Sequence, residues 1–240
     1  MIGKIKNKLR HIKNKKWFDA DFAAFDAAND GRFELDAKHN FACLNDKTTT
    51  TEFDAHYVYH PAWATRVLAD TKPEKHVDIA STLHFCAQLS AFMPVEFYDY
   101  RPAHLTLSNL KSGEADLTQL PFEDNSIASL SCMHTIEHIG LGRYGDPIDP
   151  KGDIKAINEL KRVIAKGGDL LFVVPTGKPK LMFNAHRIYS FEMIREYFKD
   201  FELKEFSLVT DNNAFIRNAD PKLVDEQNYG CGCYWFKKSE

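Results

Sequence analysis

Side chains that can handle protons and anions are concentrated in one stretch near the middle of the chain. An imidazole can accept a proton near neutral pH, and a guanidinium can bind a carboxylate or phosphate through two parallel hydrogen bonds. A tyrosine ring offers a flat surface for a sugar or another ring. The stretch contains His134, Glu137, His138, Arg143, Tyr144 and Asp146. Such convergence is typical of a reactive or ligand-binding edge rather than of a plain scaffold.

The elements predicted around this stretch place it at the edge of a parallel sheet. The apolar runs Ile127–Met133 and Leu170–Val174 predict buried strands, and Ile154–Ile164 has helical spacing between them. Lys166-Gly167-Gly168 predicts a glycine turn that ends this helix. Strand, helix and strand in this order give two parallel strands joined by a right-handed crossover. Because ligands bind outside the carboxyl ends of such strands, we expect a site directly after Met133.

Three short motifs resemble those of class I S-adenosylmethionine-dependent methyltransferases. They are Leu120-Pro121-Phe122, Glu137-His138 after a strand, and Leu160-Lys161-Arg162-Val163 before the paired glycines. The resemblance covers residues 61–238. The run from His138 to Gly152 resembles, more narrowly, a methyltransferase-like family of unassigned function that is often associated with bacterial surface-polysaccharide gene clusters.

The resemblance implies an α/β fold of the class I methyltransferase type, with a Rossmann-like, seven-stranded, mostly parallel sheet and a helical N-terminal extension. The last two strands, predicted at Phe201–Val209 and Tyr229–Phe236, form the antiparallel hairpin that closes this fold. It also implies S-adenosylmethionine as cofactor. The residues expected to bind the cofactor are Asp78, Ser81, Thr82, Asp99, Asp116 and Leu117.

The expected cofactor residues follow three successive strands. Asp99 is expected to hold the ribose hydroxyls, although an Asp there can instead cap a following helix. Asp116 is expected at the adenine amino group, with Leu117 as the apolar wall. The largest departure from the family lies in the turn after Asp78, which reads Ala80-Ser81-Thr82 where the family has glycines.

The acceptor side of the site is expected to come from the loops after the fourth and fifth strands. The candidate proton acceptors are His134, His138 and His186, and we place His134 first because it follows the strand directly. The residues expected to bind the acceptor are Arg143, Tyr144, Asp146 and Arg187. His56 and His60, before Pro61 in the expected first turn of a helix, either reach the site or serve as surface or core residues.

No metal site is expected. His134-x-x-Glu137-His138 has the letters of an inverted zinc-protease motif, but that motif requires a helix. Here a strand precedes it and Gly140 follows. Cys231 and Cys233 offer only two of the four ligands that structural zinc needs, so buried free thiols are expected.

Composition and charge limit the possible domain division, partners and cellular location of the protein. The chain has 240 residues, and we divide it into a basic amphipathic segment (1–18), an extension (19–60) and a methyltransferase-like domain (61–240). The first sixteen residues carry seven basic and no acidic side chains, so this segment lies on an anionic membrane surface or packs on a neighbouring subunit. The remainder carries 24 basic and 34 acidic residues, which argues against nucleic acid as a partner. Five scattered cysteines and no long apolar run favour a cytoplasmic protein.

Three functions remain open on the sequence. The first is methyl transfer to an oxygen or nitrogen of a small or glycan-linked acceptor. The second is a catalytically degenerate binding or scaffold protein recruited to the membrane, which the missing glycines favour. The third is metal-assisted hydrolysis by the histidines and carboxylates of the same edge.

Overall fold

The computed structural model describes the backbone of residues 2–240 and the side chains of residues 8–240. The chain divides into two compact units, Met1–Phe53 and Asp54–Glu240. The ranges taken from the sequence placed boundaries after residues 18 and 60, whereas this division falls between Phe53 and Asp54. All strands of the described chain lie in the second unit.

The first unit is built on one long helix. Helix α1 spans Ile2–Ala28, and a short 3-10 helix, η1, spans Ala37–His39 behind its N-cap Asp36. Leu9 and Ile12 of the predicted apolar stripe are exposed on α1, while the side chains of Ile2 and Ile5 lie outside the described residues. No helix in the described part of the chain combines the length and the apolar character that crossing a bilayer requires.

The second unit contains a twisted sheet of eight strands in the order β3-β2-β1-β4-β5-β10-β8-β9. The strands are β1 His76–Ile79, β2 Val95–Asp99, β3 Leu110–Glu114, β4 Ile127–Met133, β5 Ile164–Thr176, β8 Phe201–Val209, β9 Phe215–Ile216 and β10 Gly230–Lys238. Strands β1 to β5 pair in parallel, and β10 runs antiparallel between β5 and β8. The predicted closing hairpin is therefore confirmed.

The expected count of seven strands is wrong by one. The extra strand, β9, has two residues and pairs with Val209 and Leu208 at the end of β8. It arises because the polar connection after β8 folds back on that strand before it continues. Two further short strands, β6 Lys180–Met182 and β7 His186–Ile188, form a separate pair.

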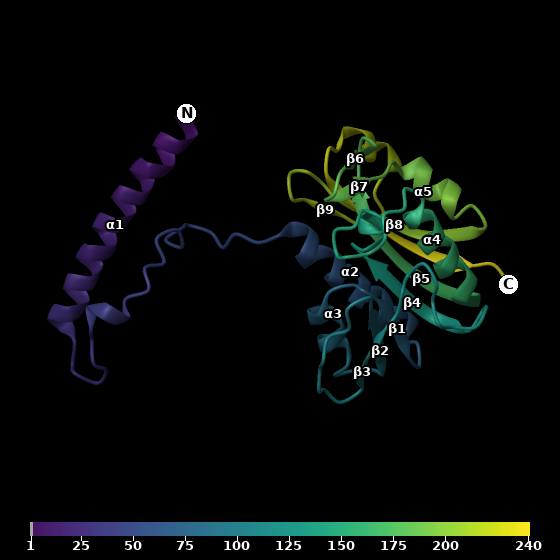
Figure 1. Cartoon of the computed structure of the whole chain (residues 1–240), viewed down its shortest axis with the longest axis horizontal. Coiled ribbons are helices and arrows are strands. Elements are labelled where there is room, and N and C mark those ends of the chain that lie inside the picture. Colours follow the sequence, from purple (N-terminus) through teal and green to yellow (C-terminus); the bar gives the residue numbers. More distant parts are fainter. Residues whose placement is uncertain (1) are drawn as a thin grey trace. The chain divides into compact units, whose positions relative to one another are not determined.

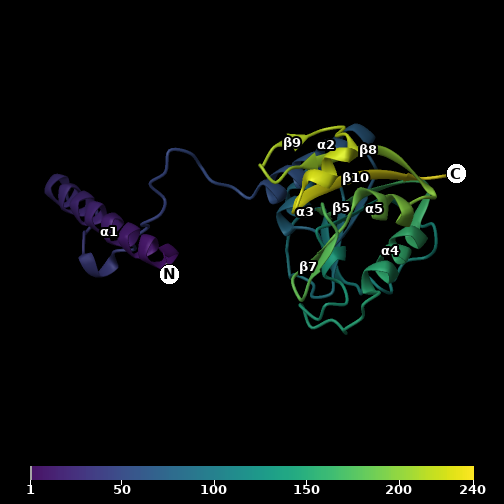
Figure 2. The same cartoon turned by 90° about the horizontal axis from the view of Figure 1, so that it is seen from above.

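Helices cover both faces of the sheet. Helices α4 (Gly152–Val163) and α5 (Phe191–Tyr197) lie on one face, and α2 (Ala55–Thr71) and α3 (Leu83–Leu89) lie on the other (Figure 1). The view from above shows the same separation (Figure 2). Strand β5 supplies both cores, because Phe172 packs on the α4 side and Leu171 and Val173 on the α2 side.

Two expectations for helix ends are wrong. Helix α2 starts at Ala55, where the Asp54 carboxylate accepts the Tyr57 N–H at 3.2 Å, so Pro61 lies inside the helix and not in its first turn. Helix α4 ends at Val163, and β5 starts at once with Ile164, so the paired glycines are part of the strand. Gly167 has φ +70° there, and a Cβ at Gly168 would lie 2.8 Å from the Ala165 carbonyl oxygen.

Candidate functional site

A cavity of about 370 Å³ opens at the carboxyl ends of β1, β2, β3 and β4. Ala80 follows β1, Asp99 ends β2, Asp116 follows β3 and His134 follows β4, and all four line the cavity. This is the edge at which open α/β sheets hold their ligands, and the volume suits a small organic molecule. The cavity therefore lies at the sheet edge where the sequence predicted a site.

The turn after β1 keeps a tight shape without glycine. Ala80 has φ +55°, a left-handed conformation that glycine adopts more readily, and its N–H donates to the Tyr98 carbonyl at 2.7 Å. The Met133 N–H donates to Ser81 Oγ at 3.0 Å, and Thr82 caps α3. Ala80 lines the cavity, whereas Asp78, Ser81 and Thr82, which were expected to bind the cofactor, do not line it.

Asp78 is fully buried beneath this turn. Its Oδ1 accepts the Ser81 N–H at 3.0 Å, and its Oδ2 accepts the Ser131 hydroxyl. His76 bonds through its two ring nitrogens to Ser129 and Ser131, both at 2.8 Å. Burial raises the pKa of Asp78 to about 6 and lowers the pKa of His76 to about 3. The pair shapes the turn through buried hydrogen bonds.

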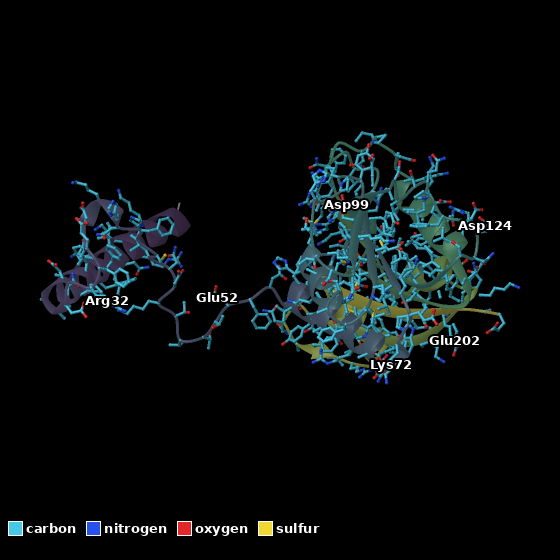
Figure 3. The ribbon with its side chains drawn as sticks, turned by 90° about the horizontal axis from the view of Figure 1, so that it is seen from below. Arg32, Glu52, Lys72, Asp99, Asp124 and Glu202 are labelled. Carbon is cyan, nitrogen blue, oxygen red and sulfur yellow. The ribbon has the colours of Figure 1, made fainter. Side chains whose placement is uncertain are left out.

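Asp99 and Asp116 present carboxylates to the cavity with one oxygen already held. Asp99 Oδ1 accepts the Arg101 N–H at 2.7 Å, and Asp116 Oδ1 accepts the Thr118 N–H at 2.8 Å. The other oxygen of each has no hydrogen-bond partner among the described residues. Figure 3 shows Asp99 well separated from Asp124 and Glu202.

Two expectations around these carboxylates can be compared with the fold. The element that follows β2 is β3, so Asp99 does not cap a helix. Leu117 lines the cavity beside Asp116. Their proposed contacts with ribose and adenine stay predictions.

The loop after β4 is tied by Asp146. Its Oδ2 accepts the Gly140 N–H at 2.7 Å and the Gly142 N–H at 3.3 Å, and its Oδ1 accepts the Tyr144 N–H at 3.2 Å. Gly140 has φ +79°, and a Cβ there would lie 2.0 Å from the Asp149 carbonyl oxygen. Asp146 therefore fixes the loop that carries Tyr144 to the cavity.

The two arginines expected to bind the acceptor differ in availability. Arg143 is exposed and donates to the Ala185 carbonyl at 3.1 Å, with its guanidinium 5.1 Å from the centre of the Tyr144 ring. Arg187 donates to the Ile139 carbonyl at 2.7 Å and pairs with buried Asp153 at 3.5 Å. Arg187 is thus occupied in joining β7 to the loop, while Arg143 remains at the surface.

The predicted histidines come together beside the cavity. His134 Nδ1 lies 2.9 Å from Glu137 Oε1, and His138 Nδ1 lies 2.6 Å from the Ala185 carbonyl oxygen. His134 and His138 line the cavity, and burial lowers the pKa of His186. The segment Ile136–His138 is one 3-10 turn, η2, so the helix of the zinc-protease motif is missing as expected.

Tyr57 in helix α2 and Tyr229, directly before β10, are aromatic residues that sequence reasoning did not assign to the site, whereas His56 was left open between the site and a surface or core role. The His56 ring stacks on His134 at 5.4 Å and on Tyr229 at 5.1 Å, and Tyr57 stacks on His134 at 5.4 Å. Burial lowers the pKa of His56 to about 4 and raises that of Tyr57 to about 12. The four ring-bearing residues in the segment 56–60 were the sequence signal that could have indicated this group. No local sequence feature around Tyr229 indicated that its side chain lies beside His56.

Sequence comparison matches the second half of the site but assigns it no activity. A family described as "Caenorhabditis protein of unknown function, DUF268" matches residues 121–224. An uncharacterized protein of Methanocaldococcus jannaschii is 29% identical over 106 residues, which are 42% of this chain and 40% of that protein. The match thus spans less than half the length of this curated relative.

Solved structures with the same fold include methyltransferases. N-methyltransferase NodS from Bradyrhizobium japonicum, solved with S-adenosyl-L-homocysteine, has a TM-score of 0.56 and 13% identity over 79% of this chain and 90% of its own. The 1,6-didemethyltoxoflavin-N1-methyltransferase from Burkholderia thailandensis has a TM-score of 0.54 and 10% identity over 76% of this chain and 79% of its own. The likeness shows the fold, and the predicted class I methyltransferase type is confirmed.

Proposed function

We propose that this protein transfers a methyl group from S-adenosylmethionine to an oxygen or nitrogen of a small acceptor. The observation that carries the proposal is the cavity edge formed by Ala80, Asp99 and Asp116 at the ends of three neighbouring strands. The solved methyltransferases of this fold, two of them named with the demethylated cofactor, support the choice of reaction.

The residues at this edge fit the cofactor. Asp99 and Asp116 line the cavity, and each keeps one carboxylate oxygen without a partner among the described residues, suited to hydroxyl and amino donors, while Ile79 and Leu117 supply apolar walls. The left-handed Ala80 lets the backbone come close to a ligand where a larger side chain would stand in the way. Bound S-adenosylmethionine would supply an electrophilic methyl group on a sulfonium.

The protein must orient the acceptor and remove its proton. His134 borders the cavity and, with Nδ1 held by Glu137, directs Nε2 to the side of α2. His134 thus governs deprotonation in this proposal, and Arg143 and Tyr144 position an anionic or ring-bearing acceptor. A glycan-linked acceptor is one member of this class, and a peripheral membrane location through the basic segment is the setting that would suit it.

Calorimetry with S-adenosylmethionine and its demethylated product tests the proposal. One site per chain is expected, and Asp99→Ala should weaken binding by about 1.5–3 kcal/mol because charge-assisted hydrogen bonds are lost. Glu114→Ala is the matched control, since Glu114 ends β3 and does not line the cavity. Absence of binding by the folded protein would refute methyl transfer and favour the scaffold alternative.

A further inference from the structure

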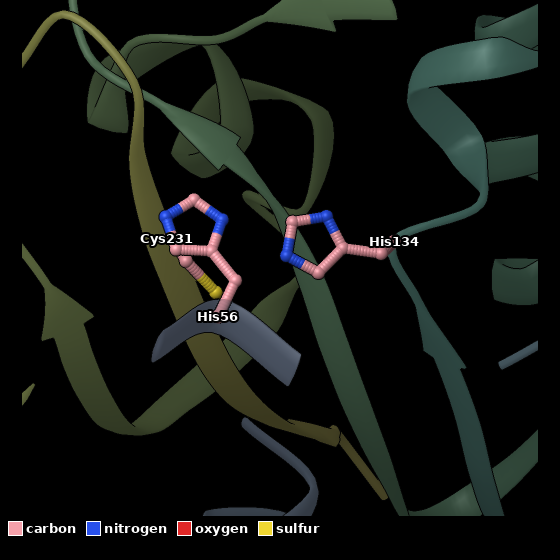
Figure 4. A group of neighbouring side chains, drawn as sticks. All are labelled: His56, His134 and Cys231. Carbon is pink, nitrogen blue, oxygen red and sulfur yellow. The ribbon is translucent and has the colours of Figure 1, made fainter. Parts of the chain in front are cut away.

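Three metal-ligating side chains meet beside the cavity from three separate elements. His56 comes from the first turn of α2, His134 follows β4, and Cys231 lies in β10. One ligand atom from each lies within 4.8 Å of the others. Figure 4 shows the three side chains pointing toward one another, and the residues are 78 and 97 positions apart in sequence.

Three imidazoles in this region hold a buried nitrogen without a partner. The Nε2 atoms of His134, His60 and His186 are buried and have no hydrogen-bond partner among the described residues. The His134 side chain is 3% exposed and His60 is 0% exposed. Buried polar atoms are nearly always paired, so three free nitrogens in one place need a reason. Ring stacking explains why the imidazole rings lie together, but it gives these nitrogen atoms no hydrogen-bond partner.

The outer contacts of His134 are those of a metal ligand. Its Nδ1–H donates to Glu137 Oε1 at 2.9 Å, which fixes the tautomer that leaves the Nε2 lone pair free. Glu137 is itself 1% exposed. A buried carboxylate behind a histidine raises the basicity of the ring and orients it toward an ion. His60 donates through Nδ1 to the His56 carbonyl at 2.6 Å and so steadies the turn that carries His56.

We propose that His56, His134 and Cys231 bind a divalent zinc-type ion with one position open toward the acceptor. Two imidazoles and one thiolate are ligands that zinc accepts, and three protein ligands with an open position are typical of catalytic zinc. In a tetrahedral site the ligand atoms are about 3.4–3.6 Å apart, so the side chains need to close by roughly 1 Å. Cys233, 3.9 Å from Cys231 between the sulfur atoms, is outside the group.

The ion gives His134 a defined part in the proposed reaction. The ion would bind an acceptor hydroxyl at its open position and lower the pKa of that hydroxyl, so the acceptor would lose its proton to solvent before it attacks the methyl carbon. This role rests on the proposed methyl transfer, whereas the metal site itself does not. An acceptor with a metal-binding oxygen atom is therefore favoured over a plain amine.

Cobalt titration of the full chain, first treated with a chelator and kept reduced, tests the site. One Co²⁺ per chain is expected, with visible bands of tetrahedral cobalt and a thiolate-to-cobalt charge-transfer band. Cys231→Ser should remove the charge-transfer band, and Cys233→Ser, the matched control on the same face of β10, should keep it. His56→Asn and His134→Asn should each weaken cobalt binding by at least about 100-fold, and Glu137→Gln by about 10–100-fold with the band retained.

Three outcomes overturn the proposal. They are no stoichiometric cobalt binding by the intact protein, an unchanged band in Cys231→Ser, and loss of the band in Cys233→Ser alone. Circular dichroism and thermal unfolding of each variant show whether it is folded. Calorimetry with S-adenosylmethionine on the same variants separates the two proposals, because the cofactor residues Asp99 and Asp116 are not metal ligands here.

Discussion

The guanidinium of Arg101 lies 4.7 Å from the centre of the Tyr144 ring, and both residues line the cavity. Arg101 follows β2, whereas Tyr144 belongs to the loop after β4, so this contact joins two loops across the cavity. Arg143 stacks on the same ring at 5.1 Å. The Tyr144 ring thus contacts two cations.

Tyr144→Leu should loosen this contact and weaken S-adenosylmethionine binding about two- to five-fold. An exposed cation–π contact is worth about 0.5–1 kcal/mol, which sets this scale. Tyr144→Phe keeps the ring and should stay within about two-fold of the native affinity. Calorimetry measures both, and equal weakening in the two variants would show that the hydroxyl and not the ring matters.

His134→Ala should keep cofactor affinity within a few-fold and lower turnover by about 10²–10⁴ once an acceptor is found. In the proposed function His134 governs the acceptor's deprotonation, and loss of such a group lowers the rate more than it lowers binding. Arg143→Ala should instead raise KM, because in the proposed function Arg143 positions the acceptor and does not touch the reacting atoms. Normal turnover in His134→Ala alongside an inactive His186→Ala would move the assignment to His186.

Ala80→Gly should raise the free energy of unfolding by about 0.5–1 kcal/mol. An L-residue in the left-handed region costs about 1–2 kcal/mol, and part of the relief is offset by the greater freedom of glycine when unfolded. Ala87→Gly, inside α3, is the control and should lower stability by about 1 kcal/mol. Urea unfolding distinguishes the two, and a loss of stability in both variants contradicts the strained turn.

Asp78→Asn should remove a loss of stability that the native protein shows as pH rises from about 4 to 6. The pKa of Asp78 is raised from 3.8 to about 6, so the folded state binds more protons than the unfolded state between these values. This carboxyl therefore lowers stability as pH rises through that window, with the full cost above about pH 6. The free energy of unfolding of Asp78→Asn, relative to that of the native protein, should rise by about 1.4 kcal/mol per pH unit between about pH 4 and 6. The total difference should approach about 3 kcal/mol.

His76→Gln is the counterpart with the opposite sign. The pKa of His76 is lowered from 6.5 to about 3, so the folded state binds fewer protons there and its stability rises with pH. The free energy of unfolding of the native protein should therefore rise relative to that of His76→Gln as pH rises over this window. Urea unfolding at several pH values measures both slopes, and parallel curves for the native protein and both variants would exclude this buried pair as the cause.

Removal of residues 1–16 should release the protein from anionic vesicles in a sedimentation assay. The segment carries seven basic residues, each worth about 1 kcal/mol near such a surface, so the full chain should sediment at low salt and less at high salt. Neutral vesicles are the control. Equal sedimentation of the two forms would show that the basic segment is not the anchor.

Local pattern was enough to place most of the edge. The bounds predicted for Ile127–Met133 and Phe201–Val209 are those of β4 and β8, because a buried strand shows itself as an apolar run between polar turns. Asp99, Asp116 and His134 were located at strand ends for the same reason. Ser190 caps α5 in the same local way, since its hydroxyl accepts the Met193 N–H at 3.2 Å.

Tertiary structure alone decided which of these residues are free to act. Arg187 looked available in sequence, yet the fold engages it with the Ile139 carbonyl and Asp153. The same holds for the group of His56, His134 and Cys231, whose members are far apart in the chain. They meet because β10 enters the sheet between β5 and β8 and α2 packs across that face, and no local spacing encodes strand order. Period and capping are local properties of the chain, whereas a shared cluster depends on contacts that form only when the sheet closes.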